Sequence, residues 1–573
     1  MHQARAVVWR AVVLGVALLS GTTASSRQYE SPVYEYAQRV SAAAESEDAD
    51  PTRHNHVLML EDGRDALLFR VHLIRNAQST IDIQTCILAN DECGRLILCE
   101  LFEAARRGVM VRLMLDHFLS ERDARWIAAL SEAHPNLELR YYRPPAQHAA
   151  PPLLLEAAYA LLRFKKTNQR MHNKLMVFDN EIGIVGGRNI DNHYFNHSTR
   201  HNFIDRDAVV VGPAVEAMQT SFKDYWYFRR AEPSYKLRDV RAIIEAGAFD
   251  QIRRAEDFDV DAFRAEVCAR LEDHAYVRER FVAPFREAQR LEYIWDAPGK
   301  NQGKWLWGGG RAVRRIRDVI RKTDEELVMQ SPYLILNYHS RRRFRKLQRQ
   351  DPPPTVIVST NSFASTDNTL AYSANYKMRS TYIERLGFQV FELKAHPESL
   401  DEWLPNFEEL QARAQEAGEP REPFLSVHGK SIVVDSRIAY VGSFNLQPRS
   451  ENLNTENGVL IEDPAIARAV RDAILSVTEP TCSWVIWKRQ FPLTDVNYLI
   501  EGLSGLSPVD IWPLRNTTSF ELRPGMEPVP PGHENFYEHY ADAGSFPGAE
   551  GLSTRQIVTR IYKMLGSLAV PIL

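Results

Sequence analysis

The strongest constraint on the fold is a pattern of polar residues that occurs twice in the chain. The segments MHNKLMVFDNEIGIVGGRN (171–189) and VHGKSIVVDSRIAYVGSFN (427–445) both follow the formula H-x-K-x4-D-x6-G-[G/S]-x-N. Two matches with the same spacing and the same ending indicate an internal duplication. We therefore expect two related lobes, each carrying one copy of the motif.

Each copy has one histidine, one lysine, one aspartate and one asparagine at matching positions. The pairs are His172 with His428, Lys174 with Lys430, Asp179 with Asp435, and Asn189 with Asn445. Side chains alternate along a strand, so residues two apart point the same way. The apolar run after each lysine predicts a strand, a turn and a second strand. We expect each histidine and lysine to lie side by side on a strand and face a polar cleft.

The duplication extends beyond the motifs to a pair of acidic residues. Alignment of VVVGP (209–213) with VLIEDP (459–464) brings Asp205 opposite Glu456. Each half then supplies one acid on the strand that follows its motif. The expected result is a two-fold cleft formed half from each lobe.

Alternating strand and helix patterns predict an α/β architecture with mixed sheets. The predicted units are a signal peptide or short anchor (1–24), a polar segment (25–55), a first lobe (56–230), a helical connector (231–300), a second lobe (301–490), and an irregular arm with a final helix (491–573).

The first residues have the order of a secretory signal. Arg5 and Arg10 precede the apolar run AVVLGVALL (11–19), and the small residues SGTTASS follow. This apolar run is short for a membrane span. Thr22 stands where a lipoprotein signal would need its lipid-bearing cysteine. The sequence therefore predicts export, with the signal either cleaved or kept as a weak anchor.

Charge and cysteine content narrow the function classes. The chain has 70 basic and 74 acidic residues, and this net charge of -4 gives no general field for nucleic acid. The five cysteines show no zinc-binding spacing and no disulfide framework. We expect buried free thiols, although a bridge from Cys93 to Cys86 or to Cys99 is conceivable.

The two H-x-K-x4-D motifs make the chain resemble the phospholipase D superfamily. The segments RMHNKLMVFDNEIGIVGGRNI and STNSFASTDNTLAYSANYKMRS resemble the bacterial cardiolipin synthases, above all the C type. The resemblance implies two pseudo-symmetric phospholipase D-like lobes, each a mixed sheet flanked by helices, with the active site at the lobe interface. One departure is Asp191, Asn192 and His193 before Tyr194, where that branch usually has Gly-Asp-Glu.

The resemblance also implies roles for the repeated residues. His172 is expected to be the nucleophile that forms a phosphohistidine, and His428 the general acid and later the general base. Lysines and asparagines would bind the phosphoryl oxygens, together with Ser443. Asp205 and Glu456 would each orient a histidine, although the sequence does not say which. Asp179 and Asp435 either take part in the chemistry or fix the motif turn, and the turn interpretation is favoured.

The implied reaction transfers a phosphatidyl group to the hydroxyl of phosphatidylglycerol, with no cofactor or metal. The expected partners are phospholipids, including phosphatidylethanolamine as a further substrate, and a membrane surface, with no nucleic acid. With the export signal, this predicts a protein of the bacterial cell envelope at the periplasmic face of the inner membrane. The alternatives are a phospholipase D that hydrolyses phospholipids to phosphatidic acid, a metal-independent nuclease and a non-catalytic lipid-binding protein.

Three segments could face lipid. They are the apolar PPLLLEAAYALLRF (151–164), the tryptophan-bearing KWLWGGG (304–310) and the basic HSRRRFRKLQR (339–349). Each also has a plainer interpretation, which we favour: core packing for the first, an inter-lobe loop for the second and a solvated helix face for the third.

Overall fold

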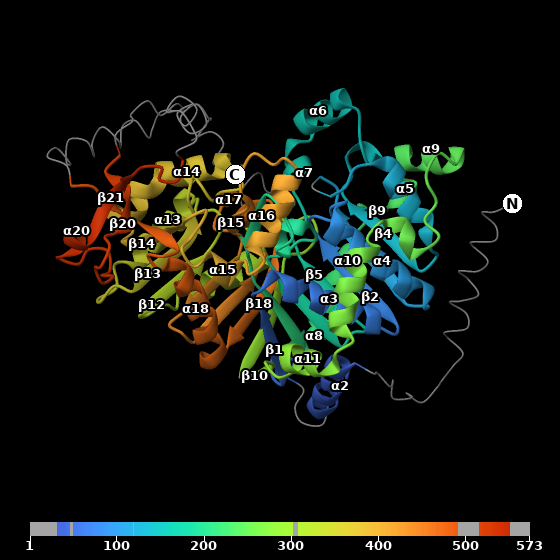
Figure 1. Ribbon diagram of the computed structural model, residues 1–573, viewed down its shortest axis with the longest axis horizontal. Helices are drawn as coiled ribbons and strands as arrows, with labels where there is room; N and C mark the ends of the chain where they lie inside the picture. Colours follow the sequence, from blue (N-terminus) through green and yellow to red (C-terminus); the bar gives the residue numbers. More distant parts are fainter. Residues whose placement is uncertain (1–30, 46–49, 119, 302–307, 491–514, 550–573) are drawn as a thin grey trace.

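The computed structural model describes residues 31–45, 50–118, 120–301, 308–490 and 515–549. Two large β-sheets form its framework, and each contains the hairpin of one copy of the motif (Figure 1). Helices cover the sheets, so the predicted α/β architecture with two mixed-sheet lobes is confirmed. The predicted signal over 1–24 lies outside the described residues.

The first sheet has nine strands in the order β10-β1-β8-β6-β5-β2-β3-β4-β9. Strands β2, β3 and β4 run parallel, and every other neighbouring pair is antiparallel. The bounds are β1 (Asn55–Leu60), β2 (Thr80–Thr85), β3 (Met110–Asp116), β4 (Leu137–Tyr142), β5 (Leu175–Phe178), β6 (Ile182–Gly186), β8 (Asp207–Val211), β9 (Ala231–Pro233) and β10 (Arg286–Ala288).

The second sheet has ten strands in the order β11-β18-β17-β16-β12-β13-β14-β19-β20-β21. Its parallel strands are β12, β13 and β14. The bounds are β11 (Arg290–Trp295), β12 (Glu326–Gln330), β13 (Thr355–Asn361), β14 (Phe388–Leu393), β16 (Ser431–Val434), β17 (Ile438–Gly442), β18 (Asn457–Glu462), β19 (Ser483–Lys488), β20 (Thr517–Leu522) and β21 (Tyr540–Gly544).

The two sheets repeat one topology. The run β1-β8-β6-β5-β2-β3-β4-β9 of the first matches β11-β18-β17-β16-β12-β13-β14-β19 of the second, strand for strand. In both, the strand after the motif lysine pairs with the next strand in an antiparallel hairpin, β5 with β6 and β16 with β17. The sequence duplication therefore corresponds to a structural one.

Helices pack on the outer sides of the sheets and between the lobes. Buried residues of α3 and α4 join the core of the first sheet, and those of α12 and α13 join the core of the second. A further core between the lobes includes α8 and α18, and β17 and β18 lie against β6 there. The bounds are α3 (Gly63–Asn76), α4 (Glu92–Arg106), α8 (Ala214–Trp226), α12 (Arg311–Ile320), α13 (Tyr338–Leu347) and α18 (Pro464–Thr478).

The remaining helices lie in the loops, the connector and the two ends of the described chain. They are α2 (Pro32–Glu45), α5 (Ala124–Ala133), α6 (Leu153–Leu162), α7 (Phe164–Asn168), α9 (Arg238–Ala246), α10 (Asp261–Leu271), α11 (His274–Val277), α14 (Thr369–Ser380), α15 (Leu400–Trp403), α16 (Phe407–Glu416), α17 (Pro448–Asn452) and α20 (Phe536–His539).

Three predicted units differ from what the sequence suggested. The connector 231–300 is mostly helical, yet it also gives β9 and β10 to the first sheet and β11 to the second. The polar segment 25–55 contains α2, whose Tyr34 is fully buried because one apolar side of the helix packs on the first lobe. In the arm 491–573, β20 and β21 extend the second sheet, and the predicted final helix lies outside the described residues.

The apolar segment 151–164 is not a core element. It forms α6, which projects from the first lobe (Figure 1), and its leucines are exposed. Leu153, Leu154, Leu161 and Leu162 expose between 81% and 86% of their surface. Core packing was therefore the wrong prediction for this segment. Of KWLWGGG, residues 304–307 lie outside the described residues.

Cysteines and membrane spans complete the description. All five cysteines are free thiols, so neither conceivable bridge is present. Within the described ranges, no helix combines the length and the apolar character needed to cross a bilayer.

Candidate active site

The motif histidines lie in short extended segments just before β5 and β16. The prediction that histidine and lysine sit on a regular strand is therefore wrong, because the strands begin only at Leu175 and Ser431. The reason is that these segments bond across the lobes. The amide of His172 donates to the carbonyl of Thr455 at 3.1 Å, and that of His428 donates to Ile204 at 2.9 Å.

The segment before His428 forms a small sheet of its own with the other lobe. Strand β15 (Phe424–Val427) pairs in parallel with β7 (His201–Ile204) of the first lobe. On the other side, Met171 and Thr455 form an isolated parallel bridge. Backbone bonds of both lobes therefore fix where the two histidines stand.

Each histidine binds a carboxylate from the opposite lobe. Nδ1 of His172 lies 2.9 Å from Oε2 of Glu456, and Nδ1 of His428 lies 2.6 Å from Oδ2 of Asp205. The sequence predicted both acids but not this crossed pairing. Both acids stand just before their strands, β18 and β8, rather than on them. A carboxylate on Nδ1 fixes the tautomer that carries the proton there, which leaves the lone pair on Nε2.

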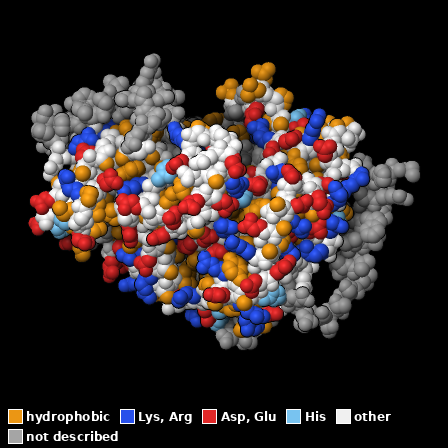
Figure 2. Space-filling model, viewed as in Figure 1, with side chains coloured by type: hydrophobic (Ala, Val, Ile, Leu, Met, Phe, Trp, Pro, Cys, Tyr) orange, Lys and Arg blue, Asp and Glu red, His pale blue; other side chains and the backbone are white. Residues whose placement is uncertain are grey.

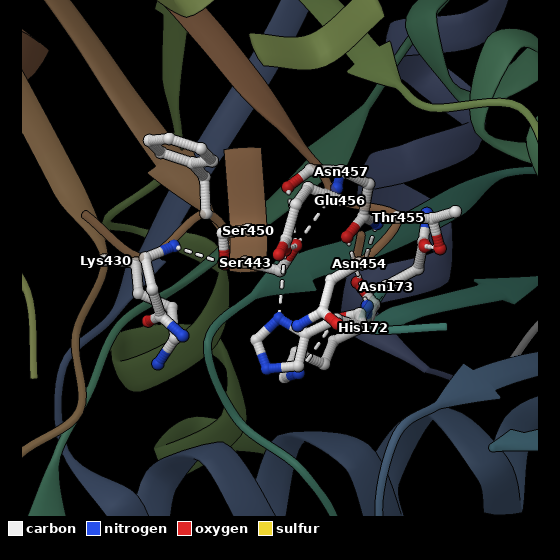
Figure 3. A network of polar contacts seen from close by, with 12 residues as sticks. His172, Asn173, Lys430, Ser443, Ser450, Asn454, Thr455, Glu456 and Asn457 are labelled. Carbon is white, nitrogen blue, oxygen red and sulfur yellow. Dashed lines mark hydrogen bonds and ion pairs between the residues drawn. The ribbon is translucent and has the colours of Figure 1, made fainter. Parts of the chain in front are cut away.

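The Glu456 carboxylate is held by a network that involves both lobes (Figure 3). The hydroxyl of Ser443 donates to the same oxygen that faces His172. The Glu456 amide donates to Asp296 at 3.1 Å, and Asp296 in turn pairs with Lys300 at 2.8 Å. These contacts orient the carboxylate before any substrate arrives.

Asp205 is held by backbone instead of by a hydroxyl. Its Oδ1 accepts the amide of Arg206 at 2.7 Å. Gly187, which matches Ser443 in the repeat, lies so close that a Cβ there would stand 2.0 Å from Oδ1 of Asp205. A side chain at this position would displace the acid, so only glycine fits.

The two lysines are buried beside their histidines. Nζ of Lys174 donates to the carbonyl of His172 at 2.8 Å. Nζ of Lys430 lies 2.8 Å from Nδ1 and 3.1 Å from Nε2 of His428. Burial lowers the pKa of Lys174, and burial lowers that of Lys430 to about 7 although Asp205 opposes the shift. An anion close to these ammonium groups would restore their charge.

Burial also lowers the pKa of both histidines. Glu456 opposes the effect at His172, whereas the cations Lys174 and Lys430 add to it. For His428, burial and Lys430 lower the pKa, and Asp205 opposes them. Each histidine therefore responds to charges from both lobes, which shows that the two half-sites form one electrostatic unit. We call it the paired site.

The two ring nitrogens that face away from the acids differ. Nε2 of His428 contacts the hydroxyl of Tyr194 at 3.3 Å in addition to Lys430. For Nε2 of His172, the described part of the chain supplies no hydrogen-bond partner. His172 thus presents the more accessible lone pair.

The motif asparagines support the paired site from the side. Nδ2 of Asn189 donates to the hydroxyl of Tyr194 at 2.7 Å. Asn445 has a buried Oδ1 with no hydrogen-bond partner among the described residues, and its backbone N–H donates to the hydroxyl of Ser450 at 3.3 Å. Only Asn189 therefore contacts a group that touches a motif histidine.

The motif aspartates lie elsewhere. The carboxylate of Asp179 accepts the backbone amides of Gln78, Ser79 and Thr80 at 2.7–2.8 Å, and that of Asp435 accepts the backbone amides of residues 324–326 at 2.8–3.0 Å. Both have positive φ, near 50°, as turn residues of this type often do. A whole strand separates each from its histidine, roughly 13 Å by strand geometry. The structure therefore does not bring Asp179 and Asp435 into the paired site.

Three residues of the site were missed from the sequence. Tyr194 was noted only as part of a departure from the family pattern, although it lies next to both Asn189 and His428. Asp296 and Lys300 belong to the quoted segment WDAPGK, yet nothing in it shows that they hold Glu456. What marks these residues as part of the site is their contact with a distant segment of the chain, and a single sequence does not reveal such contacts.

Within the described ranges, no cluster of three or more potential ligand side chains could hold a metal ion. The groups near the histidines are one carboxylate for each ring, together with lysines, an amide and hydroxyls. The paired site therefore offers a nucleophile, a proton carrier and cations for a phosphate group.

A family model described as "Cardiolipin synthase, PLD-like domain" matches residues 71–226 and 316–477, one match for each lobe. The chain belongs to this family. It is 29% identical to cardiolipin synthase C of Escherichia coli K12 over 72% of this chain and 82% of that protein. An uncharacterized protein of Helicobacter pylori J99 is also 29% identical, over 76% of this chain and 82% of the other. The resemblance to cardiolipin synthases of the C type is confirmed.

Among solved structures, phosphatidylserine synthase of Haemophilus influenzae Rd KW20 matches with a TM-score of 0.48 and 15% identity. The match covers 78% of this chain and 91% of that one. Family membership makes this chain a phospholipid-modifying enzyme of the phospholipase D superfamily.

Proposed function

We propose that this chain is a phosphatidyltransferase that makes cardiolipin by way of a phosphohistidine. The observation that carries the proposal is the crossed pairing of two histidines with carboxylates of the opposite lobe. This arrangement prepares two imidazoles at one site, with buried lysines for the phosphate oxygens. It supports two successive displacements at phosphorus.

In the first displacement, Nε2 of His172 attacks the phosphorus of the donor lipid. The bond from phosphorus to the leaving alkoxide breaks, and that oxygen takes a proton from His428. Lys174 and Lys430 neutralise the charge that grows on the phosphoryl oxygens. Glu456 stabilises the positive charge that forms on His172.

In the second displacement, the free hydroxyl of a phosphatidylglycerol molecule attacks the phosphohistidine. His428, now neutral, takes the hydroxyl proton, and the bond from phosphorus to Nε2 breaks. One phosphodiester is exchanged for another, so the reaction needs no nucleotide. Tyr194 stands beside the nitrogen that carries the proton in both steps.

We also place the enzyme on a membrane surface, with α6 as a contact. Its exposed leucines form an apolar projection (Figure 2). At its base, Arg163, Lys166, Arg229 and Arg230 lie near one another, and their mutual repulsion lowers the pKa of Lys166. Apolar side chains bordered by cations suit the interface of an anionic bilayer.

The test is product analysis with the purified full chain and phosphatidylglycerol vesicles, with a chelator present. We expect cardiolipin and glycerol, and no cardiolipin from either His172→Ala or His428→Ala. The matched control is His274→Ala, an exposed histidine far from the motifs in sequence, which should retain full activity. Phosphatidic acid as the sole product would contradict the proposal and identify a hydrolase.

A further inference from the structure

A second site lies in the second lobe, apart from the motif histidines and lysines. A cavity of about 550 Å³ separates α12 from α13. Buried apolar side chains form its floor: Ile316, Leu336, Phe344, Leu347, Phe444 and Leu446. Volume and lining are in the range of small-molecule sites, which lie between about 300 and 1,000 Å³.

The border of this cavity is cationic. The basic residues are Arg314, Arg317, Arg321, Arg343 and Lys346. The two acids beside them are already engaged, since Glu451 pairs with Arg317 at 2.7 Å and Asp318 pairs with Arg321 at 3.3 Å. The lining therefore carries more positive than negative charge.

Three of these cations have no ion-pair partner among the residues that the structure describes. In the part of the chain that the structure describes, no carboxylate lies within ion-pair distance of Arg314, Arg343 or Lys346. Burial and the neighbouring Arg317 lower the pKa of Arg343, although Glu451 opposes the shift. A group of cations at the edge of an apolar cavity favours a ligand that carries an anion next to a hydrocarbon chain.

The back of the cavity belongs to the second motif. Phe444 and Leu446, which line it, flank Asn445, and Phe444 directly follows Ser443. The hydroxyl of Ser443 donates to Glu456, which binds His172. The segment 443–446 therefore forms a wall of the cavity and, through Ser443, also orients the Glu456 carboxylate that binds His172.

We propose that this cavity binds one molecule of an anionic phospholipid, distinct from the lipids that react. One acyl chain lies on the apolar floor, and the phosphate binds Arg314 and Arg343. Because the occupied cavity supports Phe444 and Leu446, the bound lipid also steadies Ser443 and Glu456. The site thus couples the anionic lipid content of the membrane to the paired site.

The binding test uses the full chain with His172→Ala, so that no lipid is turned over and the result does not depend on the proposed reaction. The probes are dodecyl phosphate below its micelle concentration, dodecylphosphocholine and inorganic phosphate, each followed by calorimetry. We expect dodecyl phosphate to bind at least about tenfold more tightly than the other two. The zwitterionic probe lacks net charge, and inorganic phosphate lacks the chain.

Two added changes locate the binding. Arg314→Gln with Arg343→Gln should weaken dodecyl phosphate about tenfold or more, whereas Arg315→Gln with Arg342→Gln should not. The control pair removes the same charge from the same two helices outside the cavity. Ile320→Trp should also weaken binding, because it fills the cavity and leaves the cations in place.

The proposal is overturned if dodecyl phosphate does not bind, if the two double variants behave alike, or if inorganic phosphate binds as tightly as the amphiphile. A last readout uses the protein with His172 intact. Non-reacting dodecyl phosphate should raise the transfer rate in wild type but not in the Arg314→Gln, Arg343→Gln variant. An equal response in both would exclude the coupling to Glu456.

Discussion

Oε2 of Glu456 lies 2.9 Å from Nδ1 of His172, although the two residues come from different lobes. Asp205 and His428 repeat the contact in the opposite direction, at 2.6 Å. Removal of either acid therefore disturbs the histidine of the other motif. We expect Glu456→Gln and Asp205→Asn each to lower kcat about 10²-fold or more, since the amide no longer stabilises the imidazolium.

Single-turnover assays at fixed lipid surface concentration separate the two acids. Glu456→Gln should slow formation of the phosphohistidine, which is measured by rapid quench. Asp205→Asn should slow that same first displacement, in which the alcohol leaves, and also attack by the second alcohol on the phosphohistidine. The control is Asp472→Asn, whose carboxylate lies on the surface. Normal burst kinetics in Glu456→Gln would contradict the assignment of His172 as nucleophile.

The motif aspartates should behave as structural residues. Asp179→Ala removes the acceptor for three backbone amides, and we expect a loss of roughly 3 kcal/mol in the free energy of unfolding. Asp179→Asn should recover part of this loss, because asparagine tolerates positive φ and keeps one acceptor oxygen. The measurement is urea unfolding together with activity per folded molecule at low temperature. Activity that falls as far as in His172→Ala would show a chemical role.

Lys430 predicts an alkaline limit of activity. Burial lowers its pKa to about 7, so the ammonium loses its charge as pH rises through neutrality. Burial also lowers the pKa of His172, so the nucleophile is neutral above about pH 6.5 and nucleophilicity does not limit the rate there. We expect kcat/KM, which reports the substrate-free enzyme, to fall between pH 6.5 and 8.5. Lys430→Arg should move this decline to higher pH, and a flat wild-type profile would contradict the prediction.

A histidine outside the site predicts acid sensitivity of the fold. Burial lowers the pKa of His72 to about 4, and its Nε2 lies 2.7 Å from the hydroxyl of Ser31, which precedes α2. Between pH 6.5 and 4 the unfolded chain binds a proton that the folded chain does not. Stability is therefore lost as pH falls through this window, by about 1.4 kcal/mol per pH unit.

His72→Gln tests this linkage by urea unfolding at pH 7 and pH 5. The variant should be less stable than wild type at pH 7. The difference in the free energy of unfolding between wild type and variant should shrink by about 2 kcal/mol at pH 5, because glutamine does not titrate. A gap that stays constant between the two pH values would show that His72 is not buried as a neutral ring.

The leucines of α6 predict the strength of vesicle binding. Leu154→Glu with Leu162→Glu should weaken binding to phosphatidylglycerol vesicles at least about tenfold, since each leucine contributes roughly 1.5–3 kcal/mol when buried in lipid. Turnover of a monomeric short-chain lipid should not change. Met526→Glu introduces one such charge at an exposed apolar residue of the C-terminal arm and should have no effect. Vesicle sedimentation measures the difference, and equal binding by all variants would exclude α6 as the contact.

The repeat made much of this molecule predictable. Matching spacing around His172 and His428 predicted two lobes, two hairpins and a shared site, because short-range patterns determine strands and turns. The crossed pairing could not be predicted, since it depends on β7 and β15 lying together across more than 200 residues. Tyr194 was missed for the same reason.

Other errors arose where tertiary contacts override local pattern. Leu154 and its neighbours read as core residues because periodicity shows which helix side is apolar but not what covers it. The connector looked purely helical because β9 and β10 are only three residues long, and because the longer β11 lies at its end, where it pairs with β18 of the second lobe. Such short strands exist only because a sheet edge is present to pair with them.

The Asn189–Tyr194 contact has a counterpart that differs in size. Ser450 stands at the same spacing after Asn445 as Tyr194 does after Asn189, but its hydroxyl accepts the backbone N–H of Asn445, whereas the phenol of Tyr194 accepts the side-chain amide of Asn189. In a dimer of identical subunits, any substitution would appear on both sides of the symmetry axis. Fusion of the two halves into one polypeptide removes that restriction. Each half of the site can then be substituted independently of the other. The donor lipid, whose bond is broken, and the acceptor lipid, whose bond is formed, can therefore contact different side chains.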